Sequence, residues 1–184
     1  MAFWYICLVK TGEERYVASM LNKHLANTKD YYQAFVPTKE KQIKRQGIRS
    51  KEKTICFPGY IFIESNVQQD KIRTNTFFAT MQITQLYKFI DYGDNETYAM
   101  SDNEKSILVA LMDKEYCIKE SVGVYSDGAF HIMEGALASD NVTMKHVDFH
   151  NRIAKIELSI MGETRMLTLG FDCPPKHKQS VGHV

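Results

Sequence analysis

A change of pattern part-way along the chain constrains the fold more than any other feature of this sequence. Up to residue 113, strand-like segments alternate with segments whose apolar residues recur at helical spacing, whereas from residue 122 onward only short strand-like runs remain. With 184 residues, 44% of them apolar, the chain is long enough for one domain or two small ones. We therefore expect an α+β domain at 1–113, a polar linker at 114–121, an all-β domain at 122–173 and a flexible tail at 174–184.

The first part carries the signals of an antiparallel sheet flanked by helices. Two capping boxes predict helix starts, one at Thr11 with Glu14 and one at Ser101 with Glu104, because in each the glutamate can reach back to the capping residue. A further short helix is expected to open near Gln69. The expected strands are Phe3–Lys10, Tyr31–Val36, Tyr60–Glu64 and Leu86–Ile90.

A basic segment at residues 39–53, KEKQIKRQGIRSKEK, contains seven lysines and arginines against two glutamates. Its two weakly alternating arms around Gly47 predict an exposed β-hairpin. The cations either contact DNA or RNA phosphates, which fixes position but not sequence, or simply keep a solvated hairpin soluble. The candidates for phosphate contacts are Lys44, Arg45, Arg49 and Lys51.

The stretch CFPGYIFIE at residues 56–64 places a proline and a glycine directly before an alternating strand. Proline fixes its own φ angle and has no N–H donor, and glycine weakens a strand interior, so neither extends the hydrogen-bonded ladder. Pro58 and Gly59 either close a turn within the core, or fix how Phe57 and Tyr60 are displayed to a partner. The residues alone leave both interpretations open.

Residues 122–173 predict a small β-barrel, because short strand-like runs follow one another with turn signals between them. These runs are Ala129–Met133, Thr143–Val147, Ile153–Ile160 and Met166–Leu169.

The turn at residues 148–152 and the strands beside it are the expected site of RNA contact in the second part. Phe149 can either stack on a base or pack on the barrel. His146, Asp148 and His150 would share one face of a straight strand and hold zinc or iron. Because Asp148 belongs to the expected turn, the three side chains should splay apart, and we expect no metal. The basic candidates are Lys145, His146, His150, Arg152 and Lys155.

The composition argues against several classes of protein. A formal net charge of +1 gives no global field toward nucleic acid or membrane, so any basic surface must be local. The apolar start MAFWYICLV lacks a basic leader and no stretch is long enough to span a bilayer, which predicts a cytoplasmic protein. Four widely separated cysteines fit reduced thiols rather than zinc ligands. No phosphate-binding loop or hydrolase motif is present, so we expect no enzymatic activity, no cofactor and a monomer.

Five stretches in this order resemble the NusG family of transcription elongation factors: FWYICLVKTGEE, AFVPTKE, FPGYIFIE, VGVYSDGAFHIMEGAL and VDFHNRIAKIELSIMGE. The phrases NKHL, FVPTKE, FPGYIFIES and HNRIAKIEL are most similar to specialised paralogs, the LoaP-type antiterminators. The resemblance implies an α+β NGN domain followed by an SH3-like KOW barrel. Ser139 and Val142 replace glycines usual in KOW modules, which predicts a rearranged loop because a positive φ is costly for valine.

The resemblance also implies a function and a docking site. In the family, the NGN domain docks on the clamp helices of RNA polymerase and promotes read-through, while the KOW domain contacts RNA, such as a leader hairpin, or a protein. DNA in the elongation complex, the ribosome and Rho are further partners that it implies. The alternative function is a general RNA- or ribosome-binding KOW protein. The positions that match the family's docking patch are Trp4, Tyr5, Phe57, Pro58, Gly59 and Tyr60.

Overall fold

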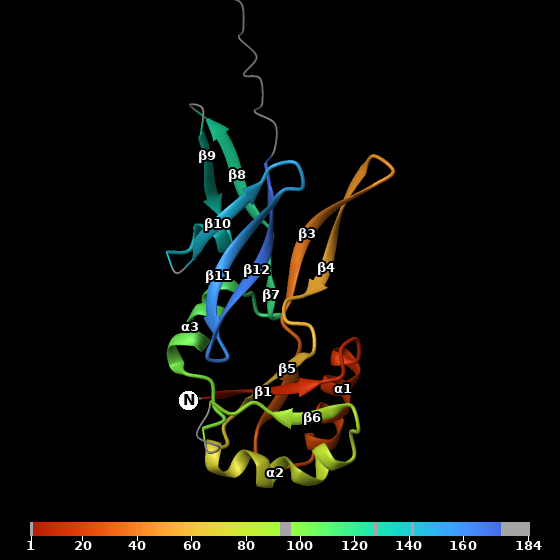
Figure 1. The fold of residues 1–184 in the computed structure, drawn as a ribbon. Coiled ribbons are helices and arrows are strands. Elements are labelled where there is room, and N and C mark those ends of the chain that lie inside the picture. The colour runs from red at the N-terminus through yellow and green to blue at the C-terminus, as the bar shows by residue number, and fades with distance from the viewer. Residues whose placement is uncertain (1, 93–96, 127–128, 141, 174–184) are drawn as a thin grey trace, which may run out of the picture.

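The protein is described by a computed structural model that covers residues 2–92, 97–126, 129–140 and 142–173, with only the backbone of Arg49. A four-stranded sheet with helices forms one end of the molecule, and a five-stranded sheet lies toward the other end beside a long hairpin (Figure 1). The tail predicted at 174–184 falls outside the described residues.

The four-stranded sheet is antiparallel and has the order β2-β5-β1-β6. Side chains alternate between its faces, so Tyr5 lies in one core and Trp4 and Ile6 lie in another. Helices α1 and α2 pack on the Tyr5 side, where Val17, Leu21 and Ile72 are buried. The elements are β1 (Phe3–Val9), α1 (Glu14–Leu25), β2 (Tyr32–Phe35), β5 (Tyr60–Ser65), α2 (Gln69–Met81) and β6 (Leu86–Phe89).

The two predicted capping boxes have different outcomes. The box before α3 (Asp102–Leu111) is confirmed, because the Glu104 N–H donates to Ser101 Oγ at 3.3 Å and the Glu104 side chain accepts from the Ser101 backbone. The Thr11–Glu14 box is wrong: α1 begins at Glu14 itself and has no side-chain cap. The Glu14 carboxylate instead accepts hydrogen bonds from two glycine amides, so it is not available for capping. The helix expected near Gln69 is α2, which has 13 residues.

The basic hairpin is confirmed as β3 (Thr38–Arg45) and β4 (Ile48–Ile55). Gln46 and Gly47 connect them with φ angles of 50° and 83°, the positive values that a tight hairpin turn requires. A short strand β7 (Cys117–Ile118) pairs parallel to β3 on its other side. The segment 114–121, expected to be a polar linker, therefore contributes two fully buried residues to a sheet, because Cys117 and Ile118 are apolar.

The five-stranded sheet has the order β10-β11-β12-β8-β9. Within the described residues β10 and β9 remain unpaired with each other at its two edges. The sheet is therefore a curled half-barrel and not the closed barrel that the sequence predicts. The loop before β10 closes with a hydrogen bond from Val142 N–H to Ser139 O at 3.0 Å, and neither residue has a positive φ. The strands are β8 (Ser121–Ser126), β9 (Ala129–Glu134), β10 (Thr143–Asp148), β11 (Ile153–Ile160) and β12 (Glu163–Asp172).

One apolar core joins the two ends of the molecule. It contains Trp4 and Phe62 from the first sheet, Leu108 from α3, and Leu158 and Ile160 from β11. In Figure 1 the β11–β12 turn reaches down beside α3 toward β1. The two parts that the sequence predicts as separate domains thus pack on each other through the face of the first sheet that α1 and α2 do not cover.

Candidate functional site

The FPGY stretch and the first strand form one aromatic surface, which we call the aromatic patch and define as Trp4, Phe57 and Tyr60. Phe62 lies beneath it, with its ring centroid 5.7 Å from that of Phe57 and 6.3 Å from that of Trp4. Trp4 and Phe57 are 3% and 5% exposed, and Tyr60 is partly buried against the same core. Three of the six predicted docking residues are therefore brought together through their side chains.

Tyr5, a fourth predicted docking residue, lies on the opposite face of the sheet. Its side chain is fully buried in the core under α1 and α2, and its hydroxyl donates to the Val67 carbonyl at 2.5 Å. Because neighbouring residues on a strand point to opposite faces, Tyr5 cannot join Trp4 in one surface. Burial, with the negative charge of Asp70 adding to it, raises the pKa of Tyr5 far above its usual value, so the phenol stays neutral. Its place is that of a core residue.

Pro58 and Gly59 form a turn that is fixed from below by Glu14. Gly59 has a φ of 84°, which favours glycine, and its N–H donates to Glu14 Oε1 at 2.7 Å. The Gly12 N–H donates to the other carboxylate oxygen at 3.0 Å, and the Gly59 carbonyl accepts from Val9 N–H at 2.8 Å. The turn is therefore locked to the start of α1 and to the end of β1, with Pro58 exposed on top.

The Glu14 carboxylate is buried, with the residue only 1% exposed. Burial alone would raise its pKa, but the hydrogen bonds from Gly59 and Gly12 stabilise the charged form and lower the pKa below the usual glutamate value. Glu14 is thus an ionised clamp at neutral pH. The sequence pattern suggested a capping role for this residue, and nothing in the pattern pointed to Gly59, which lies 45 residues further along.

The C-terminal sheet and the connecting segment cover the aromatic patch. Arg165 on β12 lies over the Tyr60 ring, with Cζ 5.0 Å from the centroid, and donates to its hydroxyl at 3.3 Å. Tyr116 stacks on Phe35 with ring centroids 3.6 Å apart and lies beside Trp4 at 6.2 Å. Neither Arg165 nor Tyr116 was predicted from the sequence, because their importance depends on which distant residues they meet.

Two buried N–H donors at the contact that covers the aromatic patch lack a hydrogen-bond acceptor within the part of the chain that the structure describes. The indole N–H of Trp4 and the Nε–H of Arg165 are both buried, and neither has a hydrogen-bond acceptor among the described residues. Leaving a buried donor unpaired costs about 1–3 kcal/mol. The contact between the C-terminal sheet and the aromatic patch is therefore weaker than its apolar content suggests.

The hairpin places its predicted nucleic-acid residues in two different settings. Lys44 and Arg45 are exposed near the turn, and Arg45 lies 3.9 Å from Glu52. Lys51 is turned toward the connecting segment, where its ammonium lies 3.1 Å from the buried carboxylate of Glu120. The side chain of Arg49, the fourth candidate, lies outside the described part of the chain.

The predicted nucleic-acid-binding residues of the C-terminal part also differ in setting: some are exposed, and others are engaged by side chains of the same protein. His146 and Lys155 are exposed and lie directly opposite each other on β10 and β11. Arg152, with a φ of 54°, points inward and contacts Asp172 and Gln42. Lys145 pairs with Glu157 at 3.4 Å, and His150 is exposed on the turn. The surface available to a nucleic acid is thus smaller than the sequence predicts.

The carboxylate of the H-x-D-x-H stretch belongs to Asp148, the last residue of β10, and is bonded to the turn that follows. Asp148 accepts from the backbone N–H of Asn151 at 2.9 Å and from its side-chain amide at 2.7 Å. These hydrogen bonds lower the pKa of Asp148 and use both of its oxygens. No group of three metal-ligating side chains occurs among the described residues. Phe149 packs its ring edge-on against Phe130, with centroids 5.1 Å apart, and stays half exposed.

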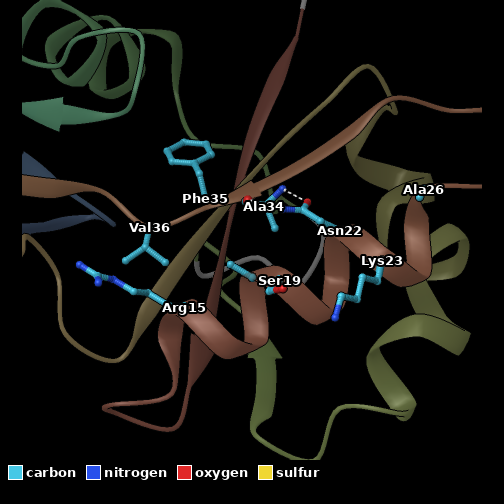
Figure 2. Close-up of a pocket in the computed structure, with 9 residues that line it drawn as sticks. Arg15, Ser19, Asn22, Lys23, Ala26, Ala34, Phe35 and Val36 are labelled. Carbon is cyan, nitrogen blue, oxygen red and sulfur yellow. Dashed lines mark hydrogen bonds between the residues drawn. The ribbon is translucent and has the colours of Figure 1, made fainter.

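A shallow groove lies between α1 and β2 (Figure 2). Within it, the Asn22 side chain donates to the Ala34 carbonyl at 2.8 Å and accepts from the Ala34 N–H at 2.7 Å. Asn22 thereby satisfies the outer backbone groups of an edge strand. Arg15 and Lys23 make the groove's margin basic. The hydrogen bonds between Asn22 and Ala34 thus give the groove a structural role at the edge of the sheet, which the sequence pattern did not reveal.

A family model described as "Transcription termination factor nusG" matches residues 2–109. The chain belongs to the NusG family. NusG relatives named "Transcription termination/antitermination protein NusG" include those of Vibrio vulnificus (strain CMCP6) and Escherichia coli (strain K12). Each is 24% identical over 172 residues, which cover 91% of this chain and 92% of the relative. The chain therefore combines an NGN domain with a C-terminal β domain, as NusG proteins do.

The fold comparison agrees with the family. A solved structure described as "Domain interaction in Thermotoga maritima NusG" superposes with a TM-score of 0.54 at 18% identity, over 92% of this chain and 94% of that one. This likeness establishes the shared fold. No described helix is long and apolar enough to cross a membrane. NusG proteins are transcription factors, and the chain is assigned to that class rather than to an enzyme family.

Proposed function

We propose that this chain is an antitermination factor of the LoaP type that docks on the clamp helices of RNA polymerase. The aromatic patch, together with Pro58 and Gly59, would be the docking surface, and the chain would then help the polymerase to read through terminators. One observation supports the proposal: the patch lies on the face of the first sheet that α1 and α2 leave uncovered, beside Leu108 of α3. Aromatic side chains held rigidly in this way make good interface anchors.

In this proposal the chain has a closed state, which is the arrangement described above, and an open state that binds. Trp4 and Phe57 must be uncovered before they can meet a polymerase, so the C-terminal sheet and the polymerase compete for the same surface. The unpaired N–H groups of Trp4 and Arg165 support such an exchange, because they make the closed contact less stable. The two moving units are proposed as residues 1–113 and 122–173.

Tyr60→Ala is expected to weaken binding to purified core RNA polymerase by roughly tenfold, because it removes one anchor of the patch. Arg165→Ala is the matched variant, since it removes the cover from Tyr60 and leaves the patch intact. It should tighten binding. Biolayer interferometry with full-length chains measures both. Equal affinities for wild type, Tyr60→Ala and Arg165→Ala would contradict the assignment of the docking surface.

We further propose that the C-terminal domain is a KOW module of the SH3-like type, which contacts an RNA hairpin through His146 and Lys155. The hairpin of β3 and β4 would contact nucleic-acid phosphates near the polymerase through Lys44 and Arg45. The exposure of these four side chains supports the proposal. Lys51 and Arg152 are left out of it, because they are engaged with Glu120 and Asp172 within the chain.

Lys44→Glu combined with Arg45→Glu should weaken binding to a fluorescently labelled DNA scaffold of the kind used to assemble elongation complexes, because two phosphate contacts are lost. A plot of the logarithm of the binding constant against the logarithm of the salt concentration has a negative slope, and the magnitude of that slope should decrease by about 1–2. Fluorescence anisotropy over a series of salt concentrations measures it. Lys29→Glu with Lys71→Glu is the matched control, since both lysines are exposed and lie outside the hairpin. If the control changes the slope as much as the test variant, the contacts are not localised to the hairpin.

A further inference from the structure

The side of the first domain formed by α2 and β6 carries a second apolar surface, which the proposed function does not use. Phe77, Phe78 and Met81 on α2 are 51%, 78% and 68% exposed, and Tyr87 on β6 is 59% exposed. They line one groove between the helix and the strand. We call these four residues the α2–β6 face. Large exposed apolar patches are rare on monomers and mark interaction surfaces.

The α2–β6 face is separate from the aromatic patch. In Figure 1, α2 and β6 lie at the end of the molecule away from β8–β12. The helix lies on the Tyr5 side of the sheet, whereas Trp4 and Phe57 belong to the other core. The α2–β6 face therefore stays accessible whether the aromatic patch is covered or open. The C-terminal sheet, which covers the aromatic patch, is not the partner of the α2–β6 face.

The charges around the groove balance each other. Asp70 and Arg73 on α2, Lys88 on β6 and Asp91 just beyond it line the same groove. Arg73 donates to the Tyr98 hydroxyl at 2.8 Å. Asp70 and Lys88 are exposed, and none of the ion pairs among the described residues includes either of them. Two carboxylates in a groove repel a phosphate backbone, so this surface favours a protein partner whose charges are also mixed.

We infer that the α2–β6 face binds a second copy of this chain through a two-fold symmetric contact. In such a contact the same surface must supply both the projection and the recess that receives it. The face meets this condition, because Phe78 is 78% exposed on the wall of the same groove that Phe77 and Tyr87 line. It also supplies both members of an ion pair, so that Lys88 of each copy meets Asp70 of the other. The chain is then a dimer, in contrast to the monomer expected from the sequence.

Sedimentation velocity of the full-length chain, from micromolar to several hundred micromolar, tests this inference. The wild type should pass from monomer to dimer over this range. Phe78→Ser should raise the dissociation constant by about tenfold or more, because it removes the projecting side chain. Ile48→Ser is the matched control: Ile48 is 73% exposed, but it lies at the hairpin turn. Circular dichroism checks that each variant is folded.

A charge exchange tests the geometry independently of any apolar substitution. Lys88→Glu and Asp70→Lys should each weaken self-association, since each places like charges across the two-fold axis. An equimolar mixture of the two variants should associate again, because both contacts then join opposite charges. A wild type that stays monomeric, an equal effect of Ile48→Ser, or a mixture that does not associate would overturn the inference. Binding of oligothymidine that depends on Phe78, with no dimer, would overturn it in favour of a nucleic-acid stacking surface.

Discussion

Gly170→Val is expected to open the closed state and to raise the affinity for RNA polymerase. A Cβ at position 170 would lie 2.8 Å from the Glu40 carbonyl oxygen and 2.8 Å from Lys41 Cα, both of them backbone atoms of β3. Backbone atoms at this distance must move apart, so the C-terminal sheet is pushed away from the hairpin. Gly170 has no positive φ, and valine suits a strand, so β12 itself accommodates the change.

The size of the expected effect follows from the proposed competition between the C-terminal sheet and the polymerase for the aromatic patch. If only a small fraction of the chain is open, the apparent dissociation constant is raised in inverse proportion to that fraction. Coupling free energies between sites are commonly about 1–3 kcal/mol, so we expect binding to tighten by about 5–150-fold. Deletion of the C-terminal sheet is not needed for this test, and both parts stay on one chain.

Trp4 provides a direct measurement of opening, because it is the single tryptophan of the chain. Its emission should shift to longer wavelength in Gly170→Val, since an indole that is 3% exposed becomes solvated. Thr164→Val is the control, because Thr164 is exposed on the same strand near the β11–β12 turn. An unchanged emission maximum together with unchanged polymerase affinity in a folded Gly170→Val protein would show that this contact does not control access to the patch.

Glu14→Ala is expected to lower the free energy of unfolding by about 2–4 kcal/mol, because the buried N–H of Gly59 and the part-buried N–H of Gly12 lose their charged acceptor. The same change should weaken polymerase binding, since Gly59 is no longer held and the display of Phe57 and Tyr60 becomes less uniform. Glu14→Gln should be destabilising too: one carboxylate oxygen is replaced by an amide that can only donate, opposite an N–H that also donates. Urea unfolding followed by far-ultraviolet circular dichroism gives the free energies.

The effect of Glu14 on stability should depend on pH in a defined direction. The folded-state pKa lies below the ordinary glutamate value of 4.5, so the stabilisation is complete above that value and is lost as pH falls through the lowered pKa. The difference between wild type and Glu14→Gln should therefore be largest at neutral pH and shrink in acid. Glu13→Gln, at an ion pair of 3.9 Å to Lys10, should change stability by less than about 1 kcal/mol at any pH. A Glu14→Gln difference that does not vary with pH would contradict the ionised clamp.

Local signals predicted the elements well, whereas side-chain roles that depend on distant contacts were not predictable. The basic hairpin, the strands and the Ser101–Glu104 box each depend on neighbours in the sequence, and the structure has them. Glu14 carries a capping signature of equal quality, but Gly59 competes for its carboxylate. No rule based on spacing weighs a cap against an acceptor needed by a turn 45 residues away.

The candidate site shows the same limit. That Trp4 and Tyr5 lie on opposite faces follows from strand alternation, and this could have removed Tyr5 from the predicted patch. The covering of Trp4 by Tyr116 and of Tyr60 by Arg165 could not be foreseen, because the sequence does not specify how the two sheets pack. The overall polarity of 114–121 predicts a linker, yet the pair Cys117–Ile118 is enough to add a strand to β3.

The short connection between β7 and β8 sets how the closed state reforms. β7 ends at Ile118 and β8 begins at Ser121, and the two residues between them are tied to the hairpin by Lys119–Glu40 at 2.9 Å and Lys51–Glu120 at 3.1 Å. A C-terminal sheet released on so short a tether keeps an effective concentration near the aromatic patch of the order of millimolar. Under the proposed function, the patch is therefore covered again soon after a polymerase is released and before another partner arrives, and each round of transcription begins from a closed factor.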